Sequence, residues 1–452
     1  MNKTLQHAIA TNLSWLNTMK QKKGYAGPVI HYWQDSINFI GPSMNWCYEG
    51  LIAAFLTLYK KTQQEKFLHL AIEAGNHLLK SQLASGIFLN SHFEANPSLG
   101  RGSTPHDTAA TLSLIYLADV LKQERRDYLP YLHAAQKNIE NYHLRFLFDA
   151  DTLLFRQCLG EKTHLYVPNK LATIIELLLA VDEITSQNKY RKIIEANADC
   201  ILQHQDKGLM AGGIYQTEQH TMIISLYTAR CIPALLKMYK ATGKKKYYQA
   251  AKAAGEFLKT MRNPEGGYHF GYIKTKGEWK MFKYPIFIAG SGDITRALLL
   301  LGEKNIAKED VNWLLKHQMP TGAFMTSYGM NLKNREIEIK EISWRDVIPV
   351  VGWNDKTLRL IAEVLPPNTS IPSEESKFPY KRECSDACYK EDQEKIKIEG
   401  KKESHVFYKK RYFSSSDALF KMVMYCALPI VNVRSDRKID IKIIDKLLKR
   451  GW

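Results

Sequence analysis

A pair of potentially reactive side chains stands directly before one of the most apolar stretches of the chain. His106 and Asp107 follow Thr104 and Pro105, and the segment 109–121 after them is largely apolar. A carboxylate beside an imidazole can transfer protons in hydrolysis, elimination or epimerisation. Asp107 can equally be a helix cap, because an acid at the start of a helix offsets the helix dipole. Both interpretations place the two side chains at the beginning of a helix.

Similar polar sets accompany five further apolar segments. Carboxylates, amides, histidines and tryptophans recur there, and these groups hold sugar hydroxyls, transfer protons and stack on sugar rings. The candidate catalytic residues are the acids Asp107, Glu49, Glu218 and Asp293. The candidate substrate-binding residues are Trp33, Asp35, Trp46, His106, Asn169, Lys170, His220, Arg345, Asp346, Trp353 and Asp355. Capping accounts for any single acid, but six sets in register predict a binding cleft where they meet.

Helical periodicity dominates residues 1–365, where amphipathic segments alternate with segments that are apolar nearly all round. The amphipathic members cover 3–19, 65–83, 128–147, 189–205, 246–262 and 307–318. The apolar members cover 44–62, 105–122, 167–187, 218–240, 285–302 and 350–365. The second members begin about every sixty residues, and a fixed period of this size indicates a repeat architecture. The pattern predicts an all-α (α/α)6 barrel with the apolar helices as its inner ring.

The long links of this predicted barrel share a glycine followed by an aromatic residue. It occurs at 86–88, 212–215, 266–268 and 322–324. A glycine that permits positive φ is expected to end each preceding helix. The pattern resembles that of α/α-toroid proteins, both the six-hairpin glycosidases and the terpenoid cyclase and prenyltransferase group. The resemblance implies a cleft lined by the long links and by the N-termini of the inner helices.

His106-Asp107 also resembles the His-Asp pair that opens a helix in the unsaturated glucuronyl hydrolases. That resemblance implies a general acid/base role for the aspartate. The segment 175–180, continuing to 188–190, resembles the helix and turn after the second essential aspartate of that family. The matching position here is Asn169 or Lys170. A second acid must therefore come from another hairpin, with Glu49, Glu218 and Asp293 as candidates.

The composition limits the classes of binding partner that are expected. The net charge of +17 favours an acidic saccharide as the substrate. The excess is spread along the chain without a basic arm or zinc-finger spacing, so no specific nucleic-acid partner is expected. No run reaches the ~18 apolar residues of a membrane span, and the N-terminus has no signal-peptide apolar block. Seven scattered cysteines favour a cytoplasmic protein without disulfides.

No metal or cofactor is expected from the motifs. Neither Cys47 nor Cys231 has convincing zinc partners, and 290–293 lacks the preceding strand of a dinucleotide fold. From residue 366 onward the helical pattern stops, which predicts a linker and a small basic C-terminal extension over 366–452. That extension could be a lid, a dimerisation arm or a strap around the barrel, and the oligomeric state stays open.

The resulting hypothesis is a carbohydrate-active enzyme that uses acid/base chemistry for hydrolysis, elimination or epimerisation. One alternative is a toroid like the terpenoid cyclases and prenyltransferases, although their aspartate-rich motifs were not found. The other alternative is a non-catalytic toroid that binds a glycan or a protein. The separation of carboxyl groups distinguishes these hypotheses, because glycosidic chemistry needs a pair of acids about 5–10 Å apart.

Overall fold

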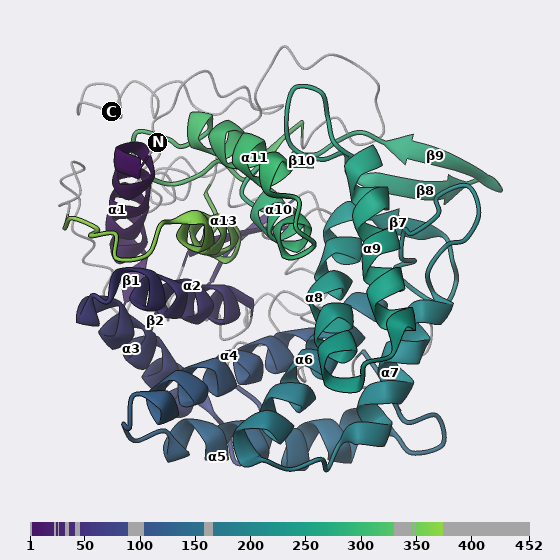
Figure 1. Ribbon diagram of the computed structural model, residues 1–452, viewed down its shortest axis with the longest axis horizontal. Helices are drawn as coiled ribbons and strands as arrows, with labels where there is room; N and C mark the ends of the chain where they lie inside the picture. Colours follow the sequence, from purple (N-terminus) through teal and green to yellow (C-terminus); the bar gives the residue numbers. More distant parts are fainter. Residues whose placement is uncertain are drawn as a thin grey trace, which may run out of the picture.

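In the computed structural model, α-helices alternate between an outer and an inner ring (Figure 1). The structure describes residues 2–21, 24–25, 27–31, 36–40, 46–88, 104–157, 166–329, 346 and 349–373. The outer helices are α1 (Asn2–Thr18), α3 (Glu65–Ser81), α5 (Leu129–Asn138), α7 (Arg191–Gln203), α9 (Lys245–Thr260) and α11 (Lys304–Lys316). The inner helices are α2 (Trp46–Thr62), α4 (Thr104–Gln123), α6 (Pro168–Thr185), α8 (Ser225–Thr242), α10 (Ser291–Leu300) and α13 (Val351–Val364).

The inner ring is closed. Each inner helix packs against the next one along the chain, and α13 packs against α2. Leu51, Ile52 and Phe55 on α2 are all buried, as expected of a helix enclosed on every side. The outer helix α3 instead buries one stripe that includes Phe67 and Leu78. The predicted all-α (α/α)6 barrel is therefore confirmed.

The repeated glycine of the links has a physical reason different from the one expected. It does not end the preceding helix, since α11 ends at Lys316 and Gly322 follows later. Gly322 has a φ of +89°, and a Cβ there would lie 2.1 Å from the carbonyl oxygen of Thr11 on α1. The Nε2 of Gln318 donates to the carbonyl oxygens of Gly322 and Ala8, both at 2.8 Å. The glycine thus lets the link approach the next outer helix, where glutamine fastens it.

Short strands occupy the links between outer and inner helices. The pairs are antiparallel: β1 (Lys20–Gln21) with β2 (Gly24–Tyr25), β3 (Gly27–His31) with β4 (Ser36–Ile40), β5 (Phe148–Asp149) with β6 (Leu154–Phe155), and β10 (Ile286–Phe287) with β11 (Ser327–Tyr328). A three-stranded sheet joins β7 (Met222–Ile224), β8 (Gly271–Thr275) and β9 (Glu278–Phe282). None of these strands was predicted.

These strands correct two predicted helix starts. The segment 218–240 begins with a loop and with β7, so α8 starts only at Ser225. The segment 285–302 begins with β10, so α10 starts at Ser291. The predicted helix 128–147 divides into α5 and the π-helix η1 (Ile139–Leu147). The other predicted boundaries agree within a few residues.

The chain beyond α13 contacts the C-terminal end of α2 and the outer helix α1. The backbone N–H of Asn368 donates to the Lys61 carbonyl, and the Nε2 of Gln6 donates to the Ser370 carbonyl. Residues 374–452, which make up most of the predicted C-terminal extension, lie outside the described residues. No helix in the described ranges is long and apolar enough to cross a membrane.

Closure of the inner ring depends on a close approach between α10 and α13. A Cβ at Gly292 would lie 2.7 Å from the backbone carbonyl oxygen of Lys356. We expect Gly292→Ala to lower the free energy of unfolding by about 1–3 kcal/mol, because backbone atoms cannot move aside as a side chain can. Gly352→Ala is the matched control, since its Cβ would meet Cys47 at an ordinary 3.6 Å. Urea denaturation measures both, and equal stability of the two variants would contradict the prediction.

Candidate functional site

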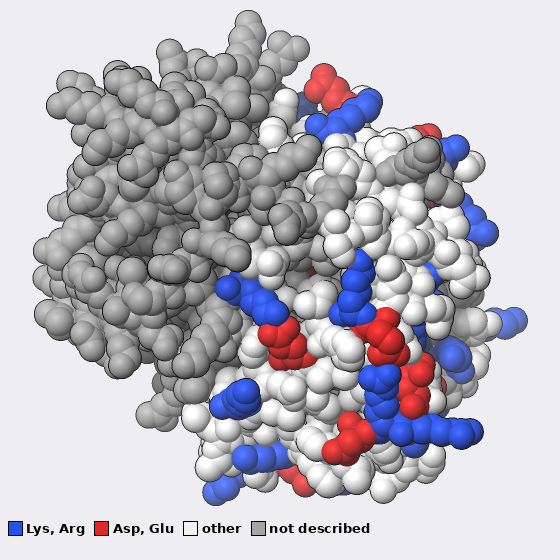
Figure 2. Space-filling view, turned by 90° about the vertical axis from the view of Figure 1, so that its left-hand side faces the viewer, with Lys and Arg blue, Asp and Glu red and all other residues white. Residues whose placement is uncertain are grey.

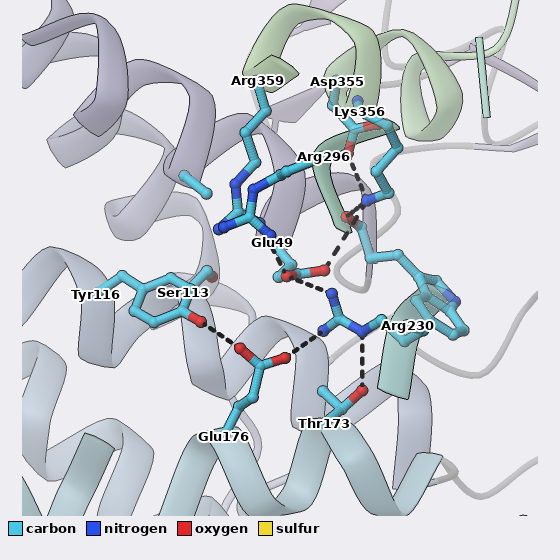
Figure 3. Close-up of polar contacts among 12 residues, drawn as sticks. Glu49, Ser113, Tyr116, Thr173, Glu176, Arg230, Arg296, Asp355, Lys356 and Arg359 are labelled. Atoms are coloured by element: carbon cyan, nitrogen blue, oxygen red, sulfur yellow. Dashed lines mark hydrogen bonds and ion pairs between the residues drawn. The ribbon is translucent and has the colours of Figure 1, made fainter. Parts of the chain in front are cut away.

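Charged side chains from the inner helices meet inside the ring (Figure 3). Arg230 on α8 is central: its Nη1 donates to Glu49 Oε1 of α2 at 3.1 Å, and its Nε donates to Thr173 Oγ1 of α6 at 3.3 Å. Its Nη2 lies 3.9 Å from Glu176 Oε1. Only 8% of Arg230 is exposed. The guanidinium therefore joins three inner helices by buried electrostatic contacts.

Glu49 is surrounded by cations. Besides Arg230, Arg359 Nη1 lies 3.5 Å from its Oε1, and Lys356 Nζ lies 3.9 Å from its Oε2. Burial by itself would raise the pKa of Glu49, but the three positive charges outweigh burial and lower the pKa. Glu49 is therefore ionised at neutral pH. We name Glu49, Glu176, Arg230, Lys237, Lys356 and Arg359 the axial cluster.

Glu176 lies deeper along α6. It accepts hydrogen bonds from Lys237 Nζ at 2.8 Å and from Tyr116 Oη at 3.2 Å. Burial would raise the pKa of Glu176, but the Lys237 ammonium and the Arg230 guanidinium outweigh burial and lower the pKa to about 2. The cluster thus continues from the beginning of the inner helices into the barrel.

The lowered pKa of Glu176 predicts a pH dependence of stability. The carboxylate stabilises the fold above its unfolded pKa of 4.5, and this contribution is lost as the pH falls towards 2. Glu176→Gln should be less stable at pH 7 and should lose less stability between pH 4.5 and 2. Urea denaturation across this pH range measures both effects. Glu218→Gln, at an exposed side chain, is the control, and an unchanged acid dependence in Glu176→Gln would contradict the prediction.

Lys356 gathers a second set of partners near the starts of α2, α10 and α13. Its Nζ donates to Asp355 Oδ2 at 3.0 Å and to the Trp46 carbonyl oxygen at 3.1 Å. Burial raises the pKa of Asp355 to about 7; Lys356 opposes this shift, and the negative charges of Asp293 and Glu49 add to it. Asp293 stands in the first turn of α10 and is partly exposed. Three acids from three helices therefore surround one ammonium.

A glycine makes room for the buried acid of this set. A Cβ on Gly50 of α2 would lie 1.9 Å from Asp355 Oδ2. Asp355 has no exposed surface, and its Oδ1 accepts the backbone N–H of Lys356. The carboxyl group is thus wedged between α2 and α13. It can influence a ligand through Lys356 rather than by direct contact.

The structure brings several predicted residues together and uses others in packing. Glu49, Asp293, Asp355 and the carbonyl of Trp46 lie around Lys356. Trp353 stacks on Phe287 with ring centroids 5.2 Å apart. Asp346 Oδ1 accepts a hydrogen bond from Ser327, and Lys170 donates to Gln157. Asn169 is buried one turn before Thr173 on α6.

Glu218 and His220 lie elsewhere. The expectation that Glu218 opens an inner helix is wrong, because it belongs to the exposed loop before β7. The ring of His220 stacks on Tyr215 at a centroid distance of 4.3 Å and faces His204 edge-on at 5.2 Å. Of the remaining predictions, Trp33, Asp35 and Arg345 lie outside the described residues, as do the side chains of His106 and Asp107 at the start of α4.

Sequence reasoning missed the basic half of the axial cluster. Arg230 and Lys237 interrupt the long apolar runs of α8, and Lys356 and Arg359 lie on the largely buried α13. A charge in a helix that is apolar nearly all round has no solvent to face, so it must meet an opposite charge inside the ring. That signal was present in the sequence. In the described ranges no group of three or more His, Cys, Asp or Glu residues could hold a metal ion.

A closed ring of six outer–inner helix pairs around a polar centre defines an (α/α)6 toroid. The structure is similar to cellobiose 2-epimerase from Bacillus thermoamylovorans B4167, with a TM-score of 0.58 and 13% identity over 80% of this chain and 100% of that one. A D-mannose isomerase matches with a TM-score of 0.57 and 14% identity over 81% of this chain and 97% of that one.

An unsaturated glucuronyl hydrolase specific for heparin is also similar, with a TM-score of 0.57 and 13% identity over 80% of this chain and 97% of that one. At these identities the likeness establishes the fold. No protein-family model matches the sequence, and no curated protein sequence matches it. The resemblance to the six-hairpin glycosidase-like superfamily is thus confirmed for the architecture, without a specific family.

Proposed function

We propose that this chain is a carbohydrate-acting enzyme that transfers protons at the N-terminal end of its inner ring. The observation that carries the proposal is the convergence of Glu49, Asp293 and Asp355 on Lys356. Burying so many charges is costly unless they are paired, and such arrangements cluster at functional sites. Structural neighbours that are an epimerase, an isomerase and hydrolases, all acting on sugars by their names, support the same class.

The environments suggest a division of roles. Pairs of acids whose surroundings move their pKa values apart are typical of acid/base sites. Glu49 has a lowered pKa, and Asp355 has a pKa raised to about 7. Asp293 is the partly exposed acid of the set, so we propose it as the proton-transfer residue that contacts substrate. Glu49 and the Asp355–Lys356 pair then fix the electrostatics around it, and Asp107 at the start of α4 stays the candidate second acid.

The test is a turnover assay on a panel of neutral and uronate-containing oligosaccharides. Chromatography detects hydrolysis, ultraviolet absorbance detects the double bond left by elimination, and proton NMR detects epimerisation. We expect one of these signals for at least one saccharide. Binding without turnover would favour the non-catalytic toroid instead. If the protein neither binds nor turns over any saccharide of the panel, the proposal is overturned. The terpenoid-cyclase-like alternative would then be tested with isoprenoid diphosphates.

A further inference from the structure

Positive charge is concentrated on the outside of the barrel where α8 ends and α9 begins. Residues 240–255 contain five lysines and no aspartate or glutamate. Lys244 pairs with Glu195 and Lys246 pairs with Asp199, both acids of α7. The other three lysines are exposed, and no acid among the described residues pairs with them: Lys240, Lys245 and Lys252. Part of the net charge of +17 thus has a definite place in the fold.

Charges elsewhere on the outside of the barrel are mixed. On the face shown in Figure 2, the described Lys and Arg side chains are scattered, and several lie beside Asp or Glu. At the start of α3, for example, Arg126 Nη2 lies 2.9 Å from Glu65 Oε2. Interspersed charges of both signs are typical of a surface that only needs to be soluble. The segment 240–255 lacks this mixture, so solubility does not explain it.

Helix stability does not explain the basic residues either. Lys245 and Lys246 are the first two residues of α9, whose first turn contains no acid. Positive side chains at this end of a helix are unfavourable, because the helix dipole is positive there. The neighbouring α7 begins in the same way with Arg191 and Lys192. Arg191 Nη1 donates to the carbonyl oxygen of Ala241, so the two helix starts lie close together. Basic residues that cost helix stability indicate a role in binding.

Two exposed tyrosines lie among these lysines. Tyr239 on α8 and Tyr248 on α9 are 38% and 42% exposed, and their ring centroids lie 5.2 Å apart. Tyr248 stands three residues after Lys245 and four before Lys252, so all three lie on one exposed face of α9. The two lysines are about 10 Å apart along the helix axis. We name Tyr239, Lys240, Lys245, Tyr248 and Lys252 the α8–α9 surface.

The spacing along α9 suits a chain of regularly placed anions. The rise of about 10 Å between Lys245 and Lys252 is close to the length of a disaccharide. A glycan with a uronate at every second sugar can therefore place one carboxylate at each lysine. The sugar between them then lies over Tyr248. Ammonium groups form strong hydrogen bonds with carboxylates, and a tyrosine ring offers an apolar face to the C–H groups of a sugar.

We propose that the α8–α9 surface binds an acidic polysaccharide with alternating uronates, on the outside of the barrel. This role goes beyond the proposed function, since the surface would hold a glycan chain away from the reacting groups. Basic surfaces with aromatic residues also suit single-stranded nucleic acids and anionic membranes. The choice of a glycan rests on the proposed carbohydrate-acting function and on the spacing of the lysines. The acidic saccharide that the net charge suggested is then a ligand of the outer surface.

Isothermal titration with defined oligosaccharides tests the inference. The probes are a hyaluronan hexasaccharide, which carries a uronate at every second sugar, and the neutral cellohexaose. The wild-type protein should bind the hyaluronan probe more tightly, by about tenfold or more. Its affinity for that probe should fall about tenfold between low and physiological salt, because salt screens attraction between exposed charges. An affinity for hyaluronan that does not depend on salt would contradict the inference.

Three variants assign the binding to residues. Lys245→Gln combined with Lys252→Gln should weaken hyaluronan binding by about tenfold or more. Lys60→Gln combined with Lys80→Gln is the matched control, because it removes the same charge from exposed positions on α2 and α3, across the ring from α9 (Figure 1). It should change the affinity by less than about twofold. Tyr248→Ser should weaken binding by about threefold or more and keep the salt dependence, because it removes no charge. Thermal unfolding confirms that each variant is folded.

The outcomes separate this inference from the proposed function. Absence of hyaluronan binding, or equal losses in the two double-lysine variants, would overturn the inference. Tighter binding of polyuridine or of phosphatidylserine vesicles, compared at equal charge, would overturn the choice of a glycan and indicate a nucleic-acid or membrane surface. Hyaluronan binding is measured without turnover. An inactive protein that binds hyaluronan through Lys245 and Lys252 would therefore overturn the proposed enzyme and support this inference.

Discussion

Replacing Arg230 by methionine should lower the free energy of unfolding by about 3–5 kcal/mol, the usual cost of removing one partner from a buried ion pair. Methionine is similarly long, so the loss comes from charge rather than from volume. Glu49 would keep only its longer contacts to Arg359 at 3.5 Å and Lys356 at 3.9 Å. Glu176 would keep Lys237 and Tyr116. Urea denaturation at pH 7, followed by circular dichroism, measures the change.

The same variant should respond differently to pH. In the wild-type protein the Arg230 charge helps to lower the pKa of Glu49 and of Glu176. Without that charge fewer cations oppose burial, and both pKa values should rise. Protonation then relieves the variant at a higher pH, so its stability deficit should shrink as the pH falls from 7 towards 4. A deficit that does not depend on pH would indicate lost packing instead of an unpaired charge.

An exposed ion pair provides the control for Arg230→Met. Arg191 on α7 pairs with Glu195 at 2.7 Å, and about a third of each side chain is exposed to water. Arg191→Met should cost less than about 1 kcal/mol, because solvent screens surface pairs. In a double-mutant cycle with Glu49→Gln, Arg230 should show a coupling energy above about 1 kcal/mol. Equal losses in Arg191→Met and Arg230→Met would contradict the buried-pair account.

The order of the hairpins could be predicted because each helix carries its own pattern. Inner helices such as α2 are apolar nearly all round, whereas α3 has one buried stripe. That contrast recurs six times, so an error in one segment does not change the predicted order of the six hairpins. The glycine followed by an aromatic residue in the long links could also be seen in the sequence, but the physical reason for the glycine could not. Only the structure shows that Gly322 lies against α1, far away in the sequence.

The starts of α8 and α10 could not be predicted for a related reason. Residues 222–224 are extended because they pair with 271–273, and residues 286–287 pair with 327–328. Helical periodicity measures only local order, and these partners lie about forty to fifty residues away. Tertiary pairing therefore decided two boundaries that the apolar pattern assigned to helix. The position assumed for Glu218 was wrong for this reason.

The candidate site also has some features that the sequence predicts and others that only the structure shows. Acids in the first helical turn, such as Glu49 and Asp293, could be found because helix starts are visible in the sequence. Their cationic partners could not be assigned, since Glu49 and Arg230 are separated by 181 positions. Nor could the sequence tell that Asp355 is wedged beside Gly50, whereas Asp293 is partly exposed. Burial and pairing determine which acid can exchange a proton.

Asp293→Asn should lower turnover by about 10²-fold or more on the saccharide that the panel identifies, which is the size of a general acid/base contribution. Asparagine has the same shape but cannot exchange the proton. It should leave the free energy of unfolding within about 1 kcal/mol, because it also suits the start of a helix. Asp293 acts electrostatically on Arg230, Lys356 and Asp355. The variant therefore also tests the acids that surround the Lys356 ammonium. Initial rates at saturating substrate, together with urea denaturation, measure both effects.

Glu218→Gln and Asp107→Asn make this prediction specific. Glu218 belongs to the exposed loop before β7, so its variant should keep wild-type turnover. Asp107→Asn should lose activity if the aspartate at the start of α4 supplies the second acid. Full activity of a stable Asp293→Asn variant would remove Asp293 from the mechanism. Loss of activity in Asp107→Asn alone would then make Asp107 the proton-transfer residue, with Lys356 and the acids around it as its electrostatic support.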